Sequence, residues 1–139
     1  MIKTPHLATD GIIEIYDGDE FQGVVLIERK NRPKGLAIPG GFVDIGEKVE
    51  DACIREMKEE TTLDVELIKL LGVYSDPKRD ERFHCVSCVY VCRASGVPKG
   101  EDDAKSAKIY KIENIPFDEL CFDHSEILRD YLENRDKDF

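Results

Sequence analysis

The chain has 139 residues, of which 41% are hydrophobic, and its 20 Lys and Arg against 30 Asp and Glu give a net charge of −10 at pH 7. This length predicts a single domain over residues 1–139 with a sizeable core. The aliphatic runs are far shorter than the roughly 20 residues of a membrane-spanning helix. Excess negative charge opposes binding to nucleic-acid polymers and anionic membranes, so neither is an expected partner.

Cysteine usage and the N-terminal residues favour the cytoplasm. Five cysteines are an odd number without a disulfide framework, and no apolar stretch of a secretory signal begins the sequence. His84, Cys85 and Cys88 resemble half of a zinc site. However, residues 83–92 are predicted to form a strand, whose alternation places positions 85 and 88 on opposite faces. We interpret most of these thiols as reduced, small buried hydrophobic groups.

The first half of the sequence predicts a hairpin, a glycine loop and a helix. Residues 7–16 and 23–29 are β-rich runs on either side of a turn. A short run, 36–38, leads to residues 39–41 (Pro-Gly-Gly), where glycine permits a positive φ or the close approach of a ligand. Residues 48–61 contain no Gly or Pro, and their apolar residues recur at helical spacing. This pattern predicts a helix with one apolar stripe and one charged face.

The second half predicts further strands and a closing helix. Strands are expected over residues 65–74, 83–93 and 107–112, with polar loops between them. Asp123 with Glu126 three residues later resembles a capping box in front of an apolar helical stripe. Strands interspersed with two such helices predict a fold of the α/β class, with a mixed sheet between helical layers.

The predicted helix at 48–61 carries an unusual group of acids. Glu56, Glu59 and Glu60 stand at i, i+3 and i+4, which places three carboxylates on one side of the helix. Arg55 and Lys58 relieve their mutual repulsion only in part. Hard ions such as Mg²⁺ and Mn²⁺ prefer carboxylate and carbonyl oxygens as ligands. The spacing alone leaves two interpretations open, a solvated charged face and a divalent-metal site.

A longer string of residues contains these three carboxylates. It reads Gly41, five residues, Glu47, seven residues, Arg55, Glu56, Met57, Lys58, Glu59, Glu60, Thr61, Thr62 and Leu63. This string resembles the Nudix box, whose signature is Gly, five residues, Glu, seven residues, Arg, Glu, aliphatic, any, Glu, Glu, any, Gly, aliphatic. The sequence matches every fixed position except that of Thr62, where the family has glycine.

The resemblance implies an α/β/α sandwich in which residues 41–63 form a loop, a helix and a second loop. It also implies metal-dependent hydrolysis of a nucleoside diphosphate linked to another group X. By position in the box, the ligands of Mg²⁺ or Mn²⁺ would be the Gly41 carbonyl, Glu56, Glu59 and Glu60. Arg55 would orient one of these carboxylates through a charge-assisted hydrogen bond. The metal would neutralise the pyrophosphate oxygens and lower the pKa of a bound water.

The resemblance leaves the general base open between two places. In this family it is either a glutamate of the box or an acid on a loop outside it. Outside the box, the candidates are Glu101, Asp102 and Asp103. We favour a glutamate of the box.

Thr62 raises a question of backbone geometry. The glycine of the family pattern follows the helix, where positive φ is common and a β-branched residue fits poorly. Either Thr62 is strained at positive φ or the local backbone has adjusted to negative φ. We expect negative φ, and we expect activity to be retained because no carboxylate is lost.

Weaker motifs resemble those of microbial ADP-ribose pyrophosphatases of this family. The segment Gly72 to Pro77 is followed by Arg79, Asp80, Arg82 and His84 in the spacing of that subgroup. Residues 101–104 and 122–128 are similar to it as well. Glu81 and Phe83 depart from it, because those relatives often have Pro and Gly at these positions.

Four residues are candidates for contacts with the substrate. Arg29, Arg79 and Arg82 are expected to clamp phosphate or ribose oxygens, although exposed arginines in polar loops are often only solvated. Phe42 would either stack on a base or pack under the box. His124 is expected to pack at the start of the closing helix rather than to act as a catalyst.

The sequence therefore predicts an enzyme with a small-molecule nucleotide substrate. The main hypothesis is hydrolysis of ADP-ribose to AMP and ribose 5-phosphate. The alternatives are a house-cleaning pyrophosphatase of nucleoside triphosphates and a non-catalytic Nudix module that senses a ligand. Intact Glu56, Glu59 and Glu60 favour catalysis. The group X, the base, the preferred metal and the formation of a homodimer are left open.

Overall fold

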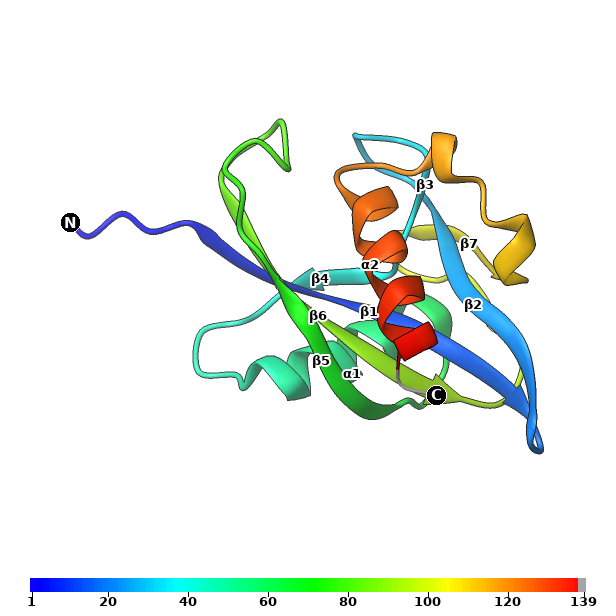
Figure 1. The fold of residues 1–139 in the computed structure, drawn as a ribbon. Coiled ribbons are helices and arrows are strands. Elements are labelled where there is room, and N and C mark those ends of the chain that lie inside the picture. Colours follow the sequence, from blue (N-terminus) through cyan, green and yellow to red (C-terminus); the bar gives the residue numbers. More distant parts are fainter. Residues whose placement is uncertain (138–139) are drawn as a thin grey trace.

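The computed structural model describes residues 1–137, and the chain begins with a long β-hairpin (Figure 1). Strand β1 (His6–Asp17) runs antiparallel to β2 (Glu20–Arg29). Gly18 adopts a positive φ of 62° in the tight turn between them, a conformation that glycine reaches without steric strain. The predicted hairpin is confirmed.

The hairpin belongs to a seven-stranded sheet. Its other strands are β3 (Leu36–Ala37), β4 (Gly40–Phe42), β5 (Glu66–Tyr74), β6 (Cys85–Ala94) and β7 (Ala104–Tyr110). The strand order is β3-β2-β1-β6-β5, with β4 paired to β1 and β7 paired to β2. Strands β1 and β6 are parallel, whereas β1 and β2 are antiparallel. The prediction of a mixed sheet is confirmed.

Two helices cover the two faces of this sheet (Figure 1). Helix α1 (Val49–Thr61) and helix α2 (His124–Lys137) each pack on their own buried cluster. Alternation along β1 explains this, because Ile13 lies in the cluster under α1 and Ile12 in the cluster under α2. Burying a side chain of this size contributes about 1.5–3 kcal/mol. The predicted α/β/α sandwich is confirmed; in the described part of the chain, neither helix is long and apolar enough to cross a bilayer.

The segment between β7 and α2 differs from its prediction. Two short 3₁₀ helices, η1 (Ile112–Asn114) and η2 (Phe117–Glu119), connect these elements. The predicted strand 107–112 was wrong in its bounds. The strand begins at Ala104 because residues from this point onward pair with β2, and the chain turns into η1 at Ile112.

The start of α2 also differs in detail from the predicted capping box. The backbone carbonyl of Asp123 accepts the N–H of Ile127 at 3.1 Å, as expected for the residue before a helix. The Asp123 carboxylate, however, accepts two hydrogen bonds from Arg79, at 2.7 and 2.9 Å. The Arg79 side chain is buried and requires a counter-charge. Asp123 therefore connects α2 to the loop between β5 and β6.

Thr62 adopts the left-handed conformation at the end of α1, with φ 66° and ψ 3°. The expectation of negative φ was therefore wrong. The Thr62 N–H closes the helix by donating to the carbonyl of Lys58 at 3.0 Å, a common way of ending a helix. Leu63 follows directly and is buried. The sharp reversal at Thr62 returns the chain to the core, which explains why the backbone does not relax.

The five cysteines are free thiols. Cys85 is buried and Cys88 is half-buried on β6, and the alternation of burial along this strand places them on opposite faces, as predicted. Cys53 and Cys92 are buried in the cluster under α1. The buried positions of Cys53, Cys85 and Cys92 confirm that most of the thiols serve as small hydrophobic groups of the core.

Candidate active site

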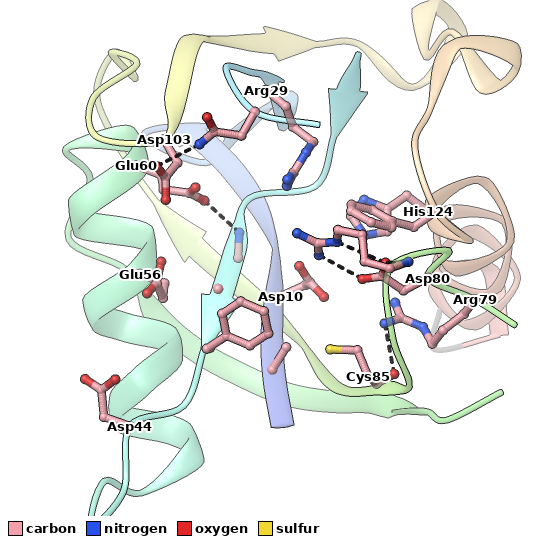
Figure 2. Close-up of a pocket in the computed structure, with 17 residues that line it drawn as sticks. Asp10, Arg29, Asp44, Glu56, Glu60, Arg79, Asp80, Cys85, Asp103 and His124 are labelled. Atoms are coloured by element: carbon pink, nitrogen blue, oxygen red, sulfur yellow. Dashed lines mark hydrogen bonds and ion pairs between the residues drawn. The ribbon is translucent and has the colours of Figure 1, made fainter. Parts of the chain in front are cut away.

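A cavity of about 360 Å³ opens between α1, β4 and the start of α2 (Figure 2). Of the predicted site residues, those that line it are Arg29, Gly41, Phe42, Glu56, Glu60, Arg79 and Arg82. Arg55 and Glu59 are not among the lining residues, and the structure brings the other candidates together. The sequence separation between Arg29 and Arg82 shows that the cavity is assembled from both halves of the chain.

Gly40 and Gly41 hold β4 directly against the acidic side of α1. The backbone N–H of Gly40 donates to Glu60 Oε1 at 2.8 Å. A Cβ atom at position 41 would overlap the carboxylate of Glu56, and one at position 40 would overlap Asp10. At position 40 a Cβ atom would also overlap the backbone carbonyl of Thr9, so glycine is required there, whereas at position 41 a Cβ atom would displace the Glu56 carboxylate.

Arg55 connects the carboxylates of the box. Its Nε and Nη2 atoms donate to the two carboxylate oxygens of Glu47 at 2.8 and 2.9 Å. Its Nη1 atom donates to Glu56 at 2.8 Å and to Glu59 at 3.3 Å. The hydrogen bond from Arg55 lowers the pKa of Glu47 to about 2. These charge-assisted contacts fix three acidic side chains relative to α1.

Two carboxylates of α1 face the cavity in a poorly solvated environment (Figure 2). Burial, followed by the charges of Glu56, Asp10 and Asp103, raises the pKa of Glu60 to about 8, against the hydrogen bond from Gly40. Burial also raises the pKa of Glu56, although Arg55 acts in the opposite direction. The protein therefore disfavours the ionised form of both carboxyl groups, and a bound cation would favour it.

The opposite wall of the cavity carries the arginines. Arg79 is almost fully buried and is held by Asp123. Arg82 is held by both carboxylate oxygens of Asp80, at 3.0 and 2.8 Å. Arg29, at the end of β2, donates from Nε to the carbonyl of Pro33 at 2.7 Å. These guanidinium groups face the carboxylates of α1 across one cavity.

His124 joins α2 to the sheet. Its Nδ1 atom accepts the backbone N–H of Ile38 at 2.9 Å, and the side chain is buried. Burial lowers the pKa of His124 to about 4, so the ring is neutral at pH 7. The geometry matches the predicted packing role.

The model of the NUDIX domain family matches residues 5–134. The chain belongs to the NUDIX family. It is 47% identical over 131 residues to the ADP-ribose pyrophosphatase of Methanocaldococcus jannaschii. The aligned region covers 92% of this chain and 73% of that protein. The prediction of a Nudix hydrolase is confirmed.

Two solved structures show the same NUDIX fold. The NUDIX domain of Shewanella oneidensis NrtR, complexed with ADP ribose, superposes with a TM-score of 0.84 at 24% identity, over 96% of this chain and 90% of that one. A bifunctional NMN adenylyltransferase/ADP ribose pyrophosphatase from Francisella tularensis, complexed with AMP and a Mn ion, gives a TM-score of 0.79 at 25% identity. That match covers 96% of this chain and 42% of the larger protein.

The donor set of this NUDIX domain fits a hard divalent cation. Glu56 and Glu60 present carboxylates, and the Gly41 backbone lies beside them. Within residues 1–137, no three acidic, His or Cys side chains are grouped closely enough to hold an ion by themselves. The Glu59 side chain is 41% exposed and contacts Arg55. Such a partial set of oxygen ligands suits Mg²⁺ or Mn²⁺, which keep waters and bind phosphate oxygens in their remaining positions.

The acidic loop between β6 and β7 reaches the same region. The N–H of Glu101 donates to the backbone carbonyl of Glu60 at 3.2 Å, which fixes the loop against the end of α1. Asp103 lines the cavity and accepts a hydrogen bond from Asn31 at 3.3 Å. Among the three acids considered outside the box, Asp103 is the one on the cavity wall.

Sequence reasoning missed Asp10, Asp80 and Phe122, which also line the cavity. Asp10 is buried on β1 and accepts a short hydrogen bond from the Ser87 hydroxyl. A carboxylate next to the apolar run of this predicted strand was a signal that could have identified it, because acidic side chains are rarely buried without a partner. Phe122 carries no comparable signal, since its contacts come from distant parts of the chain.

Proposed function

We propose that this Nudix hydrolase cleaves ADP-ribose to AMP and ribose 5-phosphate with bound Mg²⁺ or Mn²⁺. The observation that carries the proposal is one cavity with carboxylates of the box on one wall and arginines on the other. Similarity along most of the chain to an ADP-ribose pyrophosphatase supports this choice of substrate. In the reaction, water adds to one phosphorus atom, the bond to the bridging oxygen breaks, and each product keeps one phosphate.

The proposed metal ligands are Glu56, Glu59, Glu60 and the Gly41 carbonyl. When bound, the ion would neutralise phosphate oxygens and lower the pKa of a water ligand. Arg55 acts by fixing Glu56 and Glu59, to which it donates hydrogen bonds. A glutamate of the box takes the proton from the attacking water in this proposal. Asp103 is the alternative base, because it lies on the cavity wall.

The residues proposed to form the substrate-binding wall are Arg29, Arg82, Arg79 and Phe42. Arg29 and Arg82 bind phosphate or ribose oxygens, because both line the cavity with partly exposed side chains. Arg79 supports this wall through its ion pair with Asp123. Phe42 is 42% exposed at the cavity wall, which supports stacking on the base.

The experiment is a product assay across ADP-ribose, dinucleotides and nucleoside triphosphates, with added Mg²⁺ or Mn²⁺. The proposal predicts the highest kcat/KM for ADP-ribose, with AMP and ribose 5-phosphate formed in equal amounts. A triphosphate with the highest kcat/KM would identify a house-cleaning pyrophosphatase instead. Binding of ADP-ribose without hydrolysis under either metal would identify a ligand sensor.

The proposed setting is the cytoplasm, with a small-molecule nucleotide as partner. The free thiols of the five cysteines are compatible with a reducing compartment. Size-exclusion chromatography with light scattering would decide whether the enzyme is a monomer or a homodimer.

A further inference from the structure

Phe122 has a backbone conformation that is rare for a bulky residue. Its φ is 56°, in the left-handed region that favours glycine. It stands two residues before α2 and its ring lines the cavity. Residues persist in such conformations when the surrounding structure fixes them, and they cluster at functional sites. The surrounding structure therefore holds the ring of Phe122 in place at the cavity wall.

The ring of Phe122 contacts guanidinium groups from two distant segments. The Cζ atom of Arg29, at the end of β2, lies 5.0 Å from the ring centroid. The Cζ atom of Arg82, from the loop between β5 and β6, lies 5.4 Å from it. Both distances are within the range of cation–π attraction. One ring thus holds two cations at the cavity wall.

Other contacts fix the two guanidinium groups but leave donors free. Arg29 donates to the carbonyl of Pro33, and Arg82 is paired with Asp80 and also lies 4.8 Å from the ring of Phe83. Within residues 1–137, the Nη1 atom of neither arginine has a hydrogen-bond partner. These donors are therefore available to a ligand in the cavity.

The charges of this group favour an anion as that ligand. Asp80 neutralises Arg82, whereas the hydrogen-bond acceptors of Arg29 are neutral carbonyls. Two guanidinium groups on one ring repel each other unless an anion lies between them. Guanidinium groups match the geometry of phosphate oxygens.

We propose that Phe122 is a positioning residue that holds Arg29 and Arg82 as a clamp for the diphosphate of the substrate. This inference rests on the proposed function for the identity of the substrate. Phe122 itself does not touch the reacting atoms. It acts through the orientation of two donors, so its removal affects binding of the diphosphate more than the chemical step.

The chain offers a matched control outside the cavity. Arg129 lies 4.4 Å from the ring centroid of Phe117, a second phenylalanine beneath a guanidinium group. Phe117 packs against the cluster under α2 and is not among the residues that line the cavity. Phe117→Leu therefore removes a similar contact without touching the proposed clamp.

The first experiment compares kcat and KM for ADP-ribose in the wild type, Phe122→Leu, Phe122→Tyr and Phe117→Leu. Loss of two cation–π contacts in Phe122→Leu is expected to raise KM about tenfold, with kcat changed by less than about threefold. Phe122→Tyr keeps an aromatic face and is expected to retain most of the wild-type affinity. An unchanged KM in Phe122→Leu, or an equal rise in Phe117→Leu, would overturn the inference.

A further variant separates positioning from folding. Asparagine tolerates positive φ better than phenylalanine, so Phe122→Asn should unfold at an equal or higher denaturant concentration while its KM rises as in Phe122→Leu. A purely structural role predicts the opposite, with a KM for Phe122→Asn equal to that of the wild type.

Titration with inorganic pyrophosphate in Mg²⁺ tests the clamp without any turnover. Wild type is expected to bind this probe about tenfold more tightly than Phe122→Leu. Equal affinities, or no binding by the wild type, would overturn the inference. Phe122→Leu could bind pyrophosphate more weakly while the wild type does not hydrolyse ADP-ribose. That result would overturn ADP-ribose as the proposed substrate and would still support Phe122 as the residue that positions the clamp.

Discussion

Glu60 accepts the backbone N–H of Gly40 at 2.8 Å, which joins the last turn of α1 to β4 at the wall of the cavity. The contact uses one carboxylate oxygen and leaves the other for a cation. It also only partly compensates for the burial of Glu60. The same side chain therefore supports the proposed catalysis and destabilises the metal-free fold.

Glu60→Gln is expected to reduce kcat by at least about a hundredfold without unfolding the protein, because the amide keeps the shape and loses the charge. Circular dichroism and kcat at saturating Mg²⁺ would check this. Glu50→Gln is the matched control, since Glu50 is an exposed acid in the first turn of the same helix. Full turnover by the Glu60 variant would exclude this carboxylate from catalysis.

The metal-free protein should lose stability as the pH rises because of Glu60. Its pKa is raised from 4.5 to about 8 in the fold, so the folded state binds more protons than the unfolded state between these values. The raised pKa favours folding below pH 4.5, and this contribution, on the order of 5 kcal/mol, is lost as the pH rises toward 8. Urea midpoints in excess chelator should therefore show Glu60→Gln gaining stability relative to wild type as the pH rises. A constant difference would contradict the raised pKa.

Mg²⁺ or Mn²⁺ should stabilise the wild type and be required for its turnover. An ion at about a hundred times its Kd adds about 2.7 kcal/mol to the free energy of unfolding when it binds only the folded state. Thermal unfolding with Mg²⁺ and with excess chelator measures this shift. Glu60→Gln should lose most of the shift and Glu50→Gln should keep it. Turnover by wild type in excess chelator would refute the metal-dependent mechanism.

His124 should make the fold sensitive to acid. Burial lowers its pKa from 6.5 to about 4, so the unfolded state binds more protons between these values. The stability contribution is complete above pH 6.5, and it is lost as the pH falls toward 4, on the order of 3 kcal/mol. Asparagine presents an oxygen in place of the Nδ1 acceptor and does not titrate. His124→Asn should therefore lose less stability than wild type on acidification; parallel losses would show that other groups set the acid sensitivity.

Local sequence patterns were sufficient to predict helix α1, the hairpin of β1 and β2, and the α/β/α arrangement of helices and sheet. Helical and strand periodicity report which face of an element is buried, and this information lies within one segment. The clamp at Phe122 and the pairing of Arg79 with Asp123 were not predictable in this way. The ion pair joins Arg79 to Asp123, which lie 44 positions apart in the sequence. In the sequence alone, Arg79 and Asp123 look like ordinary polar loop residues and Phe122 like an ordinary apolar one.

The backbone conformation of Thr62 could not be predicted from the sequence for a different reason. The family pattern marked the position as unusual, but the choice between positive and negative φ depended on the tertiary structure. The burial of Leu63, together with the hydrogen bond from the Thr62 N–H to Lys58, requires a sharp reversal at this residue. The burial of the next side chain therefore prevailed over the intrinsic preference of threonine.

The positive φ of Thr62 predicts that Thr62→Gly stabilises the protein. A non-glycine residue in the left-handed region carries a steric cost of about 1–2 kcal/mol, whereas glycine adds about 0.5–1 kcal/mol of unfolded-state entropy. The difference favours the glycine variant by roughly 0.5–1 kcal/mol. Metal-dependent activity should be retained, because Glu56, Glu59 and Glu60 precede the helix end.

Denaturant midpoints at equal slope measure this gain. Thr62→Asn should lie between glycine and threonine, because asparagine tolerates the left-handed region in part, and Thr62→Ala should stay near the wild type because it keeps a Cβ atom. This order distinguishes relief of backbone strain from loss of the threonine side chain, which all three variants share. A lower midpoint for Thr62→Gly than for wild type would show that threonine is not strained at φ 66° in the folded protein.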